Sequence, residues 1–543
     1  MTYVIAYDVG TTGVKTCLFS VDRTISLLKS AQQGYGLTIL PDGGAEQDAE
    51  AWWAAMAATT RQVLKDGPVT PEQVAGISFC SQMQGLVLVD QDGVPVRNPM
   101  SYMDQRAKAE LKAGIAHGVQ IAGANVGKLL TSLRLTGAVS SSVKDPLWKY
   151  KWVEAHEPEN FRRVWKWLDV KEYLILRCTG EAVMTRDSAY ATFLYDTRPG
   201  HQGWSETLTR MFGVNPAHLP RICEATDAVG GLTARAAADL GLCPGTPVFG
   251  GGGDATLIGV GAGATRVGDT HIYCGTSGWV ITVTDRQMVD VTAMIAAIVG
   301  AQPGRFNYFA EMETAGKCLE WVKDHLALDE IGIYLSKQDV AESQEAVYTS
   351  LYDYMTETVR DVPPGSGGVI FTPWLHGNRC PFEDPNAAGV FFNIRLETGK
   401  TELINAVLEG TCYHLRWMLE CQEKKLRVSD PVRFVGGGAL SDVTCQRLSD
   451  ITGRRVEVVE SPQNVGAVGA AAVIAVGLGL IPSLDAVGEF IPVSTRYQPD
   501  PAKFRAYAPY YAAFKRLYRD NRKSFRLING LGAKEEALCQ KKS

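Results

Sequence analysis

The sequence predicts an α/β protein built from two similar lobes that face one shared cleft. Three observations lead to this fold class. The chain has 543 residues, which is too long for a single hydrophobic core. Short apolar runs that predict strands are interspersed with longer amphipathic runs that predict helices. One strand–turn–strand unit also occurs twice, at a separation close to half the length of the chain.

Composition and charge exclude several kinds of protein. Hydrophobic residues make up 45% and charged residues 21% of the chain, as in ordinary globular proteins. A formal net charge of -5 gives no electrostatic reason to expect nucleic acid or an anionic membrane as a partner. Twelve scattered cysteines form no CxxC pair, which argues against a zinc site or a metal cluster. Since Met1–Gly10 also lacks the features of a secretory signal, we expect free thiols and a cytoplasmic location.

The uncharged stretch Ser461–Leu484 is long enough to raise the question of a membrane span. Alanine, glycine and valine dominate it, and Pro462 and Pro482 interrupt it. This composition favours a tightly packed, buried helix over a span.

The first copy of the repeated unit lies at the N-terminus. Tyr3–Ala6 predicts a buried strand, Asp8–Gly13 a tight turn and Val14–Ser20 the returning strand. A phosphate at this turn would meet backbone N–H groups, hydroxyls and one cation. A surface hairpin with common turn residues is the alternative interpretation. The phosphate-binding candidates are Gly10, Thr11, Thr12 and Lys15.

The second copy lies near the middle of the chain. Gly275–Gly278, with the sequence Gly-Thr-Ser-Gly, separates the apolar runs His271–Cys274 and Trp279–Val283. Backbone N–H groups in such turns form anion sites, so we expect this turn to hold a nucleotide phosphate. The repeat carries more weight than either copy, because it predicts that each lobe brings one phosphate loop to a shared cleft. The candidates here are Gly275, Thr276 and Ser277.

Four consecutive glycines precede an acid at Gly250–Asp254. Glycine lets the backbone approach a ligand closely and adopt positive φ, so this segment presents one isolated carboxylate. We interpret Asp254 as a general base. The alternative is a glycine loop in which Asp254 caps the helix-like run Ala255–Val260.

Two other nucleotide-binding motifs are incomplete. Gly399-Lys400-Thr401 resembles the end of a P-loop, but the glycine required five residues earlier is Ile394. Gly259, Gly261 and Ala264 meet only the loosest dinucleotide pattern, without a clear strand before it or a helix after it. A hydride-transfer enzyme is therefore disfavoured.

Polar residues that suit a polyol follow the predicted strand Val74–Phe79. Glutamine side chains both donate and accept hydrogen bonds, as sugar hydroxyls require. An acid and a base occur shortly afterwards. The alternatives are a polar hairpin turn and an exposed helix start. The candidate substrate-binding residues are Gln82, Met83, Gln84, Asp104 and Arg106.

A third glycine-rich turn follows Phe434–Val435 and precedes the predicted helix Asp442–Thr452. Bare backbone at a helix N-terminus suits a flat base or a phosphate, although a plain strand-to-helix turn is the alternative. The candidates are Gly437, Gly438 and Ala439.

Together, in this order, these motifs resemble the FGGY carbohydrate kinases, which belong with heat-shock ATPases and actin in one superfamily. The resemblance spans nearly the whole chain, and the xylulose kinases within the family are the most similar. The segments similar to family motifs are Asp8–Thr12 with Lys15 (first phosphate motif), Gln82–Gly85 and Met103–Arg106 (sugar), Gly251–Asp254 (catalytic loop), Gly275–Ser277 (second phosphate motif), and Gly436–Gly438 with Asn464–Ala472 (adenosine).

The chain departs from the family pattern at four places. Gln84 stands where xylulose kinases usually have His, and Tyr102 where they have Trp. Asn378 replaces Glu in the family's Gly-Glu-Arg-x-Pro, and Ala255 follows the catalytic acid where Asn or Gln is more usual. All but the third lie near the expected sugar. They leave phosphoryl transfer intact and the identity of the sugar open.

The resemblance implies two ribonuclease H-like domains of the actin and hexokinase superfamily, at residues 1–247 and 248–543, which flank a deep cleft. It implies ATP-dependent phosphorylation of a sugar hydroxyl, with Asp254 as base and Asp8 holding Mg²⁺ through water. A ketopentose such as D-xylulose is the expected substrate. Another ketose or polyol, such as ribulose or a glycerol-like compound, and an ATPase switch of the same superfamily are the alternatives. Dimers are common in the family, so a homodimer is an expectation, though no stretch of sequence identifies its interface.

Overall fold

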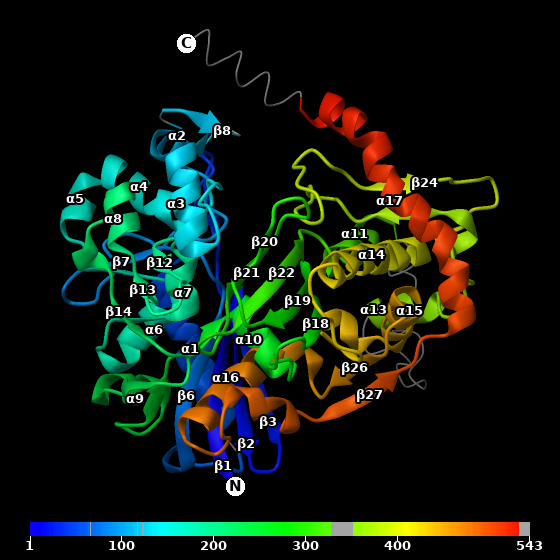
Figure 1. The fold of residues 1–543 in the computed structure, drawn as a ribbon. Helices are drawn as coiled ribbons and strands as arrows, with labels where there is room; N and C mark the ends of the chain where they lie inside the picture. The colour runs from blue at the N-terminus through cyan, green and yellow to red at the C-terminus, as the bar shows by residue number, and fades with distance from the viewer. Residues whose placement is uncertain (66, 117, 122–123, 327–350, 531–543) are drawn as a thin grey trace.

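Two large mixed β-sheets organise the fold (Figure 1). The computed structural model describes residues 1–65, 67–116, 118–121, 124–326 and 351–530. The first sheet has seven strands in the order β15-β16-β6-β1-β2-β3, with β17 also paired to β6. Its strands are β1 (Thr2–Val9), β2 (Gly13–Val21), β3 (Ile25–Gly34), β6 (Val74–Ser81), β15 (Ala228–Gly231), β16 (Pro247–Phe249) and β17 (Gly252–Gly253).

The second sheet has eight strands in the order β20-β21-β22-β19-β18-β25-β26-β27. Its strands are β18 (Thr270–Cys274), β19 (Gly278–Thr284), β20 (Val289–Asp290), β21 (Ile295–Val299), β22 (Phe306–Met312), β25 (Val432–Val435), β26 (Val456–Val459) and β27 (Val493–Tyr497).

The two sheets share one topology over six strands. From β3 to β15, successive neighbours pair antiparallel, antiparallel, parallel, parallel and antiparallel. From β22 to β27 the same series recurs. The hairpins β1–β2 and β18–β19 hold equivalent places in the two series. The predicted duplication is therefore present in the fold, and each lobe carries one of the two glycine-tipped hairpins.

Helices cover both sheets. Helix α1 (Ala49–Leu64) packs on β2 and β3, and its buried face includes Trp52, Trp53, Met56 and Val63. Helix α14 (Lys400–Glu423) packs on β19 and β22, and α15 (Asp442–Thr452) on β26. The long α17 (Pro501–Asn529) packs on α15 and α14 (Figure 1).

Two apolar helices lie between the sheets. Helices α10 (Asp254–Gly261) and α16 (Val465–Gly477) share one core cluster with side chains of β1 and β2 from the first sheet and of β19 and β25 from the second. The stretch Ser461–Leu484 therefore contains a buried helix, as its composition predicts. Within the described residues, no helix combines the length and the apolar character that a membrane span needs.

A group of smaller helices is inserted between β6 and β15 and lies beside the first sheet (Figure 1). Three of them supply residues to the site described below: α4 (Pro146–His156), α6 (Val170–Thr179) and α7 (Arg186–Ala191). The others are α2 (Lys108–Ile115), α3 (Val126–Thr136), α5 (Pro158–Arg162) and α8 (Glu206–Phe212). Helix α9 (Ala234–Leu240) follows later in the chain, between β15 and β16. Strand β17 and most of β16 lie beyond residue 247 and still pair with β6 of the first sheet. The domain boundary between residues 247 and 248 stays a prediction.

Candidate active site

A polar cavity of about 370 Å³ is lined by residues from both lobes. Its walls bring together the tip of the first hairpin, the segment after β6, the start of α10 and the tip of the second hairpin. The lining residues include Thr11, Gln82, Met83, Gln84, Tyr102, Lys144, Asp145, Asp187, Asp254, Ser277, Glu311, Glu313 and Arg379. Six of the residues predicted from the sequence to act in binding or catalysis thus line one cavity.

A second cavity of about 410 Å³ has a mainly apolar lining. Leu408, Leu415 and Phe434 supply much of this lining, and Gly437 and Gly438 expose their backbone to it. A Cβ on Gly437 would meet no heavy atom within 4 Å, so this part of the backbone is open to a ligand. A cavity of this kind suits a flat, largely apolar group such as a nucleotide base.

The tip of the β18–β19 hairpin belongs to the walls of both cavities. Gly275 and Thr276 line the apolar cavity, and Ser277 lines the polar one. The Gly316 N–H donates to the Gly275 carbonyl at 2.7 Å, which ties the tip to the start of helix α11 (Gly316–Leu326). The predicted phosphate turn therefore borders both cavities.

Asp254 is the first residue of α10 and lies in the wall of the polar cavity. Gly253 is the N-cap residue of this helix, so Asp254 does not cap it. Burial raises the pKa of the Asp254 carboxyl to about 7; the Ala255 N–H, donated at 2.7 Å, opposes the rise, and the charges of Asp8 and Glu311 add to it. A carboxyl that exchanges its proton near neutral pH suits a general base.

The glycines before Asp254 are required by close contacts. Gly251 has φ +68°, and a Cβ there would lie 2.2 Å from the Phe79 carbonyl oxygen. A Cβ on Gly253 would lie 2.0 Å from the Met83 sulfur. The glycines therefore let the backbone before Asp254 run against β6 and the polar segment that follows it.

Gln82 is buried and lines the polar cavity. Its Nε2 donates to Gln47 Oε1 at 2.9 Å, while its Oε1 has no hydrogen-bond partner among the described residues. A buried acceptor without a donor is costly, so this oxygen suits a ligand hydroxyl. Gln84 has a left-handed backbone with φ +62°, and its carbonyl accepts from the buried Lys149 ammonium at 2.7 Å.

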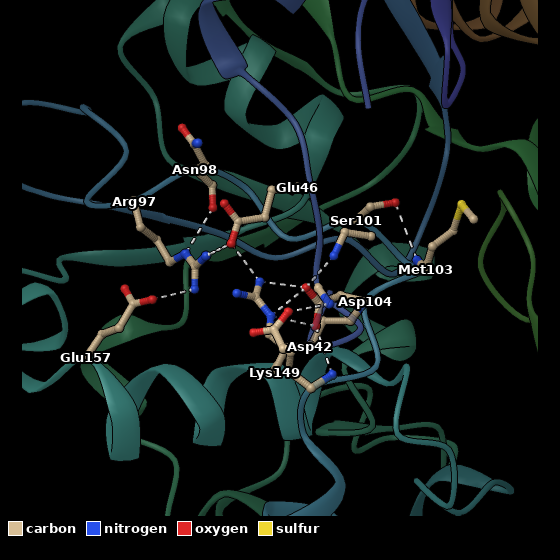
Figure 2. Close-up of polar contacts among 12 residues, drawn as sticks. Asp42, Glu46, Arg97, Asn98, Ser101, Met103, Asp104, Lys149 and Glu157 are labelled. Atoms are coloured by element: carbon tan, nitrogen blue, oxygen red, sulfur yellow. Dashed lines mark hydrogen bonds and ion pairs between the residues drawn. The ribbon is translucent and has the colours of Figure 1, made fainter. Parts of the chain in front are cut away.

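Asp104 and Arg106 do not join the residues in the cavity wall. Asp104 is fully buried and accepts from Arg106 Nη2 at 2.6 Å and from the Ala45 N–H at 2.9 Å. Arg106 also bonds Glu46 and lies 4.4 Å from the centre of the Trp152 ring. Figure 2 shows Asp104 and Glu46 within this network, which continues through Arg97 to Glu157. The structure thus places both predicted residues in an ion-pair network outside the cavity lining.

The first hairpin places Asp8 on β1 directly opposite Lys15 on β2. Burial raises the pKa of Asp8, and the Lys15 charge opposes the rise. The Lys15 ammonium donates to the Gln463 carbonyl at 3.2 Å. Neither residue lines the two cavities. Of the other predicted nucleotide contacts, Gly10 closes the turn with an N–H bond to the Gly13 carbonyl, Thr12 is exposed, and Ala439 is buried outside both linings.

Comparison with protein-family models decides the family. The N-terminal domain model of the FGGY family of carbohydrate kinases matches residues 3–261, and the C-terminal domain model matches residues 271–478. The chain belongs to the FGGY family of carbohydrate kinases. It is therefore an enzyme that phosphorylates a sugar, and kinases of this family take the phosphate from ATP.

Relatives of this FGGY kinase carry two different substrate names. The gluconokinase of Bacillus subtilis (strain 168) is 28% identical over 95% of this chain and 96% of its own length. The xylulose kinase of Escherichia coli (strain K12) is 28% identical over 95% of this chain and 98% of its own. The crystal structure of ligand-bound xylulose kinase from Lactobacillus acidophilus has a TM-score of 0.82 at 23% identity, covering 97% and 99% of the two chains.

The same comparison confirms the predicted fold. Gluconate kinase from Lactobacillus acidophilus has a TM-score of 0.80 at 23% identity, covering 96% of this chain and 99% of that chain. This FGGY kinase thus has the two-domain, actin- and hexokinase-like α/β fold of these neighbours.

Several residues around the site of this FGGY kinase escaped the sequence analysis. Gln47 donates to the Thr11 carbonyl at 2.7 Å and accepts from Gln82, so it joins the sugar segment to the first phosphate turn. Lys149 and Asp187 each contact backbone at the cavity, from helices α4 and α7. No motif surrounds these residues in the sequence. Arg379 lies in the family's Gly-Glu-Arg-x-Pro segment, which was the one available signal.

Proposed function

We propose that this kinase transfers the γ-phosphate of ATP to a hydroxyl of a neutral ketose, a ketopentose such as D-xylulose being the expected substrate. One observation carries the proposal. The β18–β19 tip is shared by an apolar cavity and a polar cavity, and Asp254 lies in the polar one. This arrangement provides a nucleotide site, a sugar site and a base at the junction that phosphoryl transfer requires.

In this proposal the adenosine occupies the apolar cavity, beside the bare backbone of Gly437 and Gly438. The turns Gly10–Thr12 and Gly275–Ser277 surround the phosphates with N–H groups and hydroxyls, and Lys15 contributes positive charge. Asp104 and Arg106 fix the polypeptide behind the sugar instead of touching it, because each is already bonded to the other.

The chemistry needs the sugar to be oriented and its hydroxyl to lose a proton. Gln82 Oε1 accepts a hydrogen bond from one sugar hydroxyl, which satisfies an otherwise unpaired acceptor. Asp254 accepts the proton of the attacking hydroxyl, an effect that contributes roughly 10²- to 10⁴-fold to such rates. Closure of the lobes over both substrates excludes water, the competing acceptor of the phosphate.

Magnesium fits the residues present. The charge of Asp8 raises the pKa of Asp254, so the two carboxyl groups lie close enough to interact. Magnesium is usually held by one or two carboxylates together with phosphate oxygens and water. A magnesium site here therefore needs no third carboxylate. Asp8 would hold the ion through water, and the bound ion would neutralise charge on the phosphates.

The charge of the polar cavity favours a neutral sugar over an aldonate. Asp145, Asp187, Asp254, Glu311 and Glu313 face two cations, Lys144 and Arg379. Arg379 is already paired with Glu311 at 2.6 Å and with Glu313 at 2.9 Å. A substrate carboxylate would therefore meet mainly like charge. Gluconate is the second candidate, since a relative is named gluconokinase and Lys144 could meet its carboxylate.

A coupled assay of ADP release tests the proposal. We would offer D-xylulose, ribulose, glycerol and gluconate with ATP and magnesium. ADP release should depend on the sugar and should be fastest with a ketopentose. Preference for gluconate would overturn the substrate assignment. ADP release at the same rate without any sugar would overturn the kinase proposal itself.

The role of Asp254 has its own test. Asp254→Asn should retain binding of sugar and ATP but lower kcat by roughly 10²- to 10⁴-fold, because the amide cannot accept the proton. Asp269→Asn is a matched control, since Asp269 also accepts backbone N–H groups but lies outside both cavities. Wild-type turnover in the Asp254 variant would show that another group is the base.

A further inference from the structure

A buried cluster of charged side chains lies against the glycine loop that carries Asp254. Asp187 of α7 accepts a hydrogen bond from the Gly253 N–H at 2.7 Å through Oδ2. A Cβ on the neighbouring Gly252 would lie 3.1 Å from the same oxygen. One carboxylate oxygen thus bonds Gly253 and lies where a side chain on Gly252 would crowd it, immediately before Asp254.

Asp187 is itself held by a second layer of bonds. Its Oδ1 accepts from the Thr185 hydroxyl at 2.5 Å. That hydroxyl accepts from Lys171 Nζ at 2.6 Å, and its single hydrogen has a much shorter path to Asp187, at 2.5 Å, than to Glu172 Oε1, at 3.4 Å. Lys171 also donates to Ser188 at 2.6 Å and pairs with Glu172. The bonds run in one direction, from the ammonium through the threonine to the carboxylate.

The cluster is buried and combines one cation, Lys171, with two acids, Glu172 and Asp187. Lys171 and Glu172 are fully buried, and Asp187 is nearly so. Burial lowers the pKa of the Lys171 ammonium, but the charges of Glu172 and Asp187 outweigh it and leave that pKa raised. The ammonium therefore stays charged and is linked to Asp187 through the Thr185 hydroxyl. A bond from a backbone N–H to a carboxylate is stronger than one between neutral groups.

The carboxylate of Asp254 depends on the backbone that Asp187 holds. The one hydrogen bond that Asp254 accepts from described residues comes from the next N–H, that of Ala255. The direction in which the Asp254 carboxylate points is therefore set by the backbone of residues 253–255. In catalysis, a misplacement of about 1 Å can lower a rate roughly 10²-fold.

We propose that Asp187 is a positioning residue that fixes the peptide at Gly253 and so aims the Asp254 carboxylate at the substrate hydroxyl. The inference rests on the proposed function, since it assigns Asp254 the role of base. Lys171 and Thr185 contribute indirectly, because the Thr185 hydroxyl, itself bonded by Lys171, donates to Asp187. Asp187 also lines the polar cavity, and its two oxygens are already engaged by Gly253 and Thr185.

A double-mutant cycle with Asp254 provides the test. Asp187→Ala should lower kcat by roughly 10- to 100-fold while changing the sugar KM less than about twofold. Asp187→Asn, which keeps an acceptor for the Gly253 N–H, should recover part of this loss. In an Asp254→Asn background, Asp187→Ala should cause no further loss, because its effect acts through Asp254.

Two outcomes of the cycle would overturn the proposal. Equal losses of kcat with and without the Asp254 carboxylate would show that Asp187 acts independently. A rise of about tenfold or more in the sugar KM would show that Asp187 binds the sugar directly. If Asp187→Ala does not fold, the same cycle is run with Asp187→Asn and judged by the same two criteria.

Hydrogen exchange separates this proposal from the kinase assignment, since it needs no substrate. Loss of Asp187 should speed amide exchange in a peptide covering residues 250–258 of the full-length protein. Asp450→Asn is the matched control: Asp450 is buried, accepts the Asp500 N–H and Gln446 Nε2 at 2.8 Å each, and lies outside both cavities. It should leave exchange in that peptide unchanged. Unaltered exchange on loss of Asp187 would refute the positioning role, whatever sugar the enzyme uses.

Discussion

At the scale of single residues, the proposed chemistry depends on an acid whose proton affinity is set by its neighbours. Burial raises the pKa of Asp254 to about 7, and the charge of Glu311 is among the causes that raise it further. Because the base must be ionised to accept a proton, kcat/KM should fall as the pH drops below about 7. Glu311→Gln removes one negative charge, so the acid limb of the pH profile should move down by roughly half a unit.

The pH profile of kcat/KM for the Glu311 variant checks this expectation. Glu313→Gln is the control, because Glu313 also pairs with Arg379 and lines the same cavity, but is not among the charges that raise the pKa of Asp254. An acid limb that stays in place, or moves to higher pH, would show that the limb does not report Asp254.

The site residues that the sequence predicts are those that stand next to glycines. Asp254 and Ser277 are predicted from turns whose glycines lie too close to neighbouring backbone or side-chain atoms to carry a Cβ. Gln47 and Asp187 carry no such mark, since each acts through a partner at least 35 residues away in the chain. Asp104 and Arg106, an acid and a base two residues apart, bond each other and lie outside the cavity lining, which no pattern in the sequence indicated.

At the scale of secondary-structure elements, the β18–β19 hairpin divides two tasks between adjacent residues. Thr276 lines the apolar cavity and Ser277 the polar one. Thr276→Val should therefore raise the KM for ATP severalfold and leave the sugar KM nearly unchanged, because one hydroxyl bond of about 1 kcal/mol is lost on the nucleotide side. Ser277→Ala should act on kcat or on the sugar KM. The measurement is of initial rates with each substrate varied in turn. Equal effects of both variants on both substrates would contradict this division.

The contact between α10 and α16 gives a second prediction at this scale. A Cβ on Gly469 would lie 2.1 Å from the Leu257 carbonyl oxygen, a backbone atom of α10. Gly469→Ala should force the helices apart and lower the free energy of unfolding by roughly 1–3 kcal/mol. Since α10 begins at Asp254, kcat should fall as well. Thermal unfolding and turnover are the measurements, and Gly36→Ala, where a Cβ meets nothing within 4 Å, is the control. Unchanged stability would show that the helices can part freely.

The elements themselves were predicted unevenly. The duplicated hairpin identified the two lobes, because its glycine turns and apolar strands are local features, and the shared six-strand topology follows from it. The helices inserted between β6 and β15 have no strict hydrophobic period, and helix α4, for instance, buries the charged Lys149. Their contribution to the site depends on packing over long sequence separations, which no local pattern encodes.

At the scale of the whole molecule, both lobes contribute charge to one cavity. Asp145, Asp187 and Asp254 come from the first half of the chain, and Glu311 and Glu313 from the second. Burial raises the pKa of Asp145 to about 6, below the value of about 7 for Asp254. The assembled cavity is therefore negative although each half contributes one cation, Lys144 or Arg379.

This negative cavity makes substrate discrimination depend on salt. At an ionic strength of about 0.05 M, kcat/KM for gluconate should lie at least roughly tenfold below that for D-xylulose, because the aldonate carboxylate meets like charge. Raising the ionic strength to about 0.5 M shortens the Debye length severalfold, so the ratio between the two substrates should narrow. D-xylulose, being neutral, serves as the internal control for effects of salt on ATP binding. A ratio that favours gluconate at low salt and weakens as salt is added would mean that Lys144 dominates the cavity, and the kinase would then be one for sugar acids.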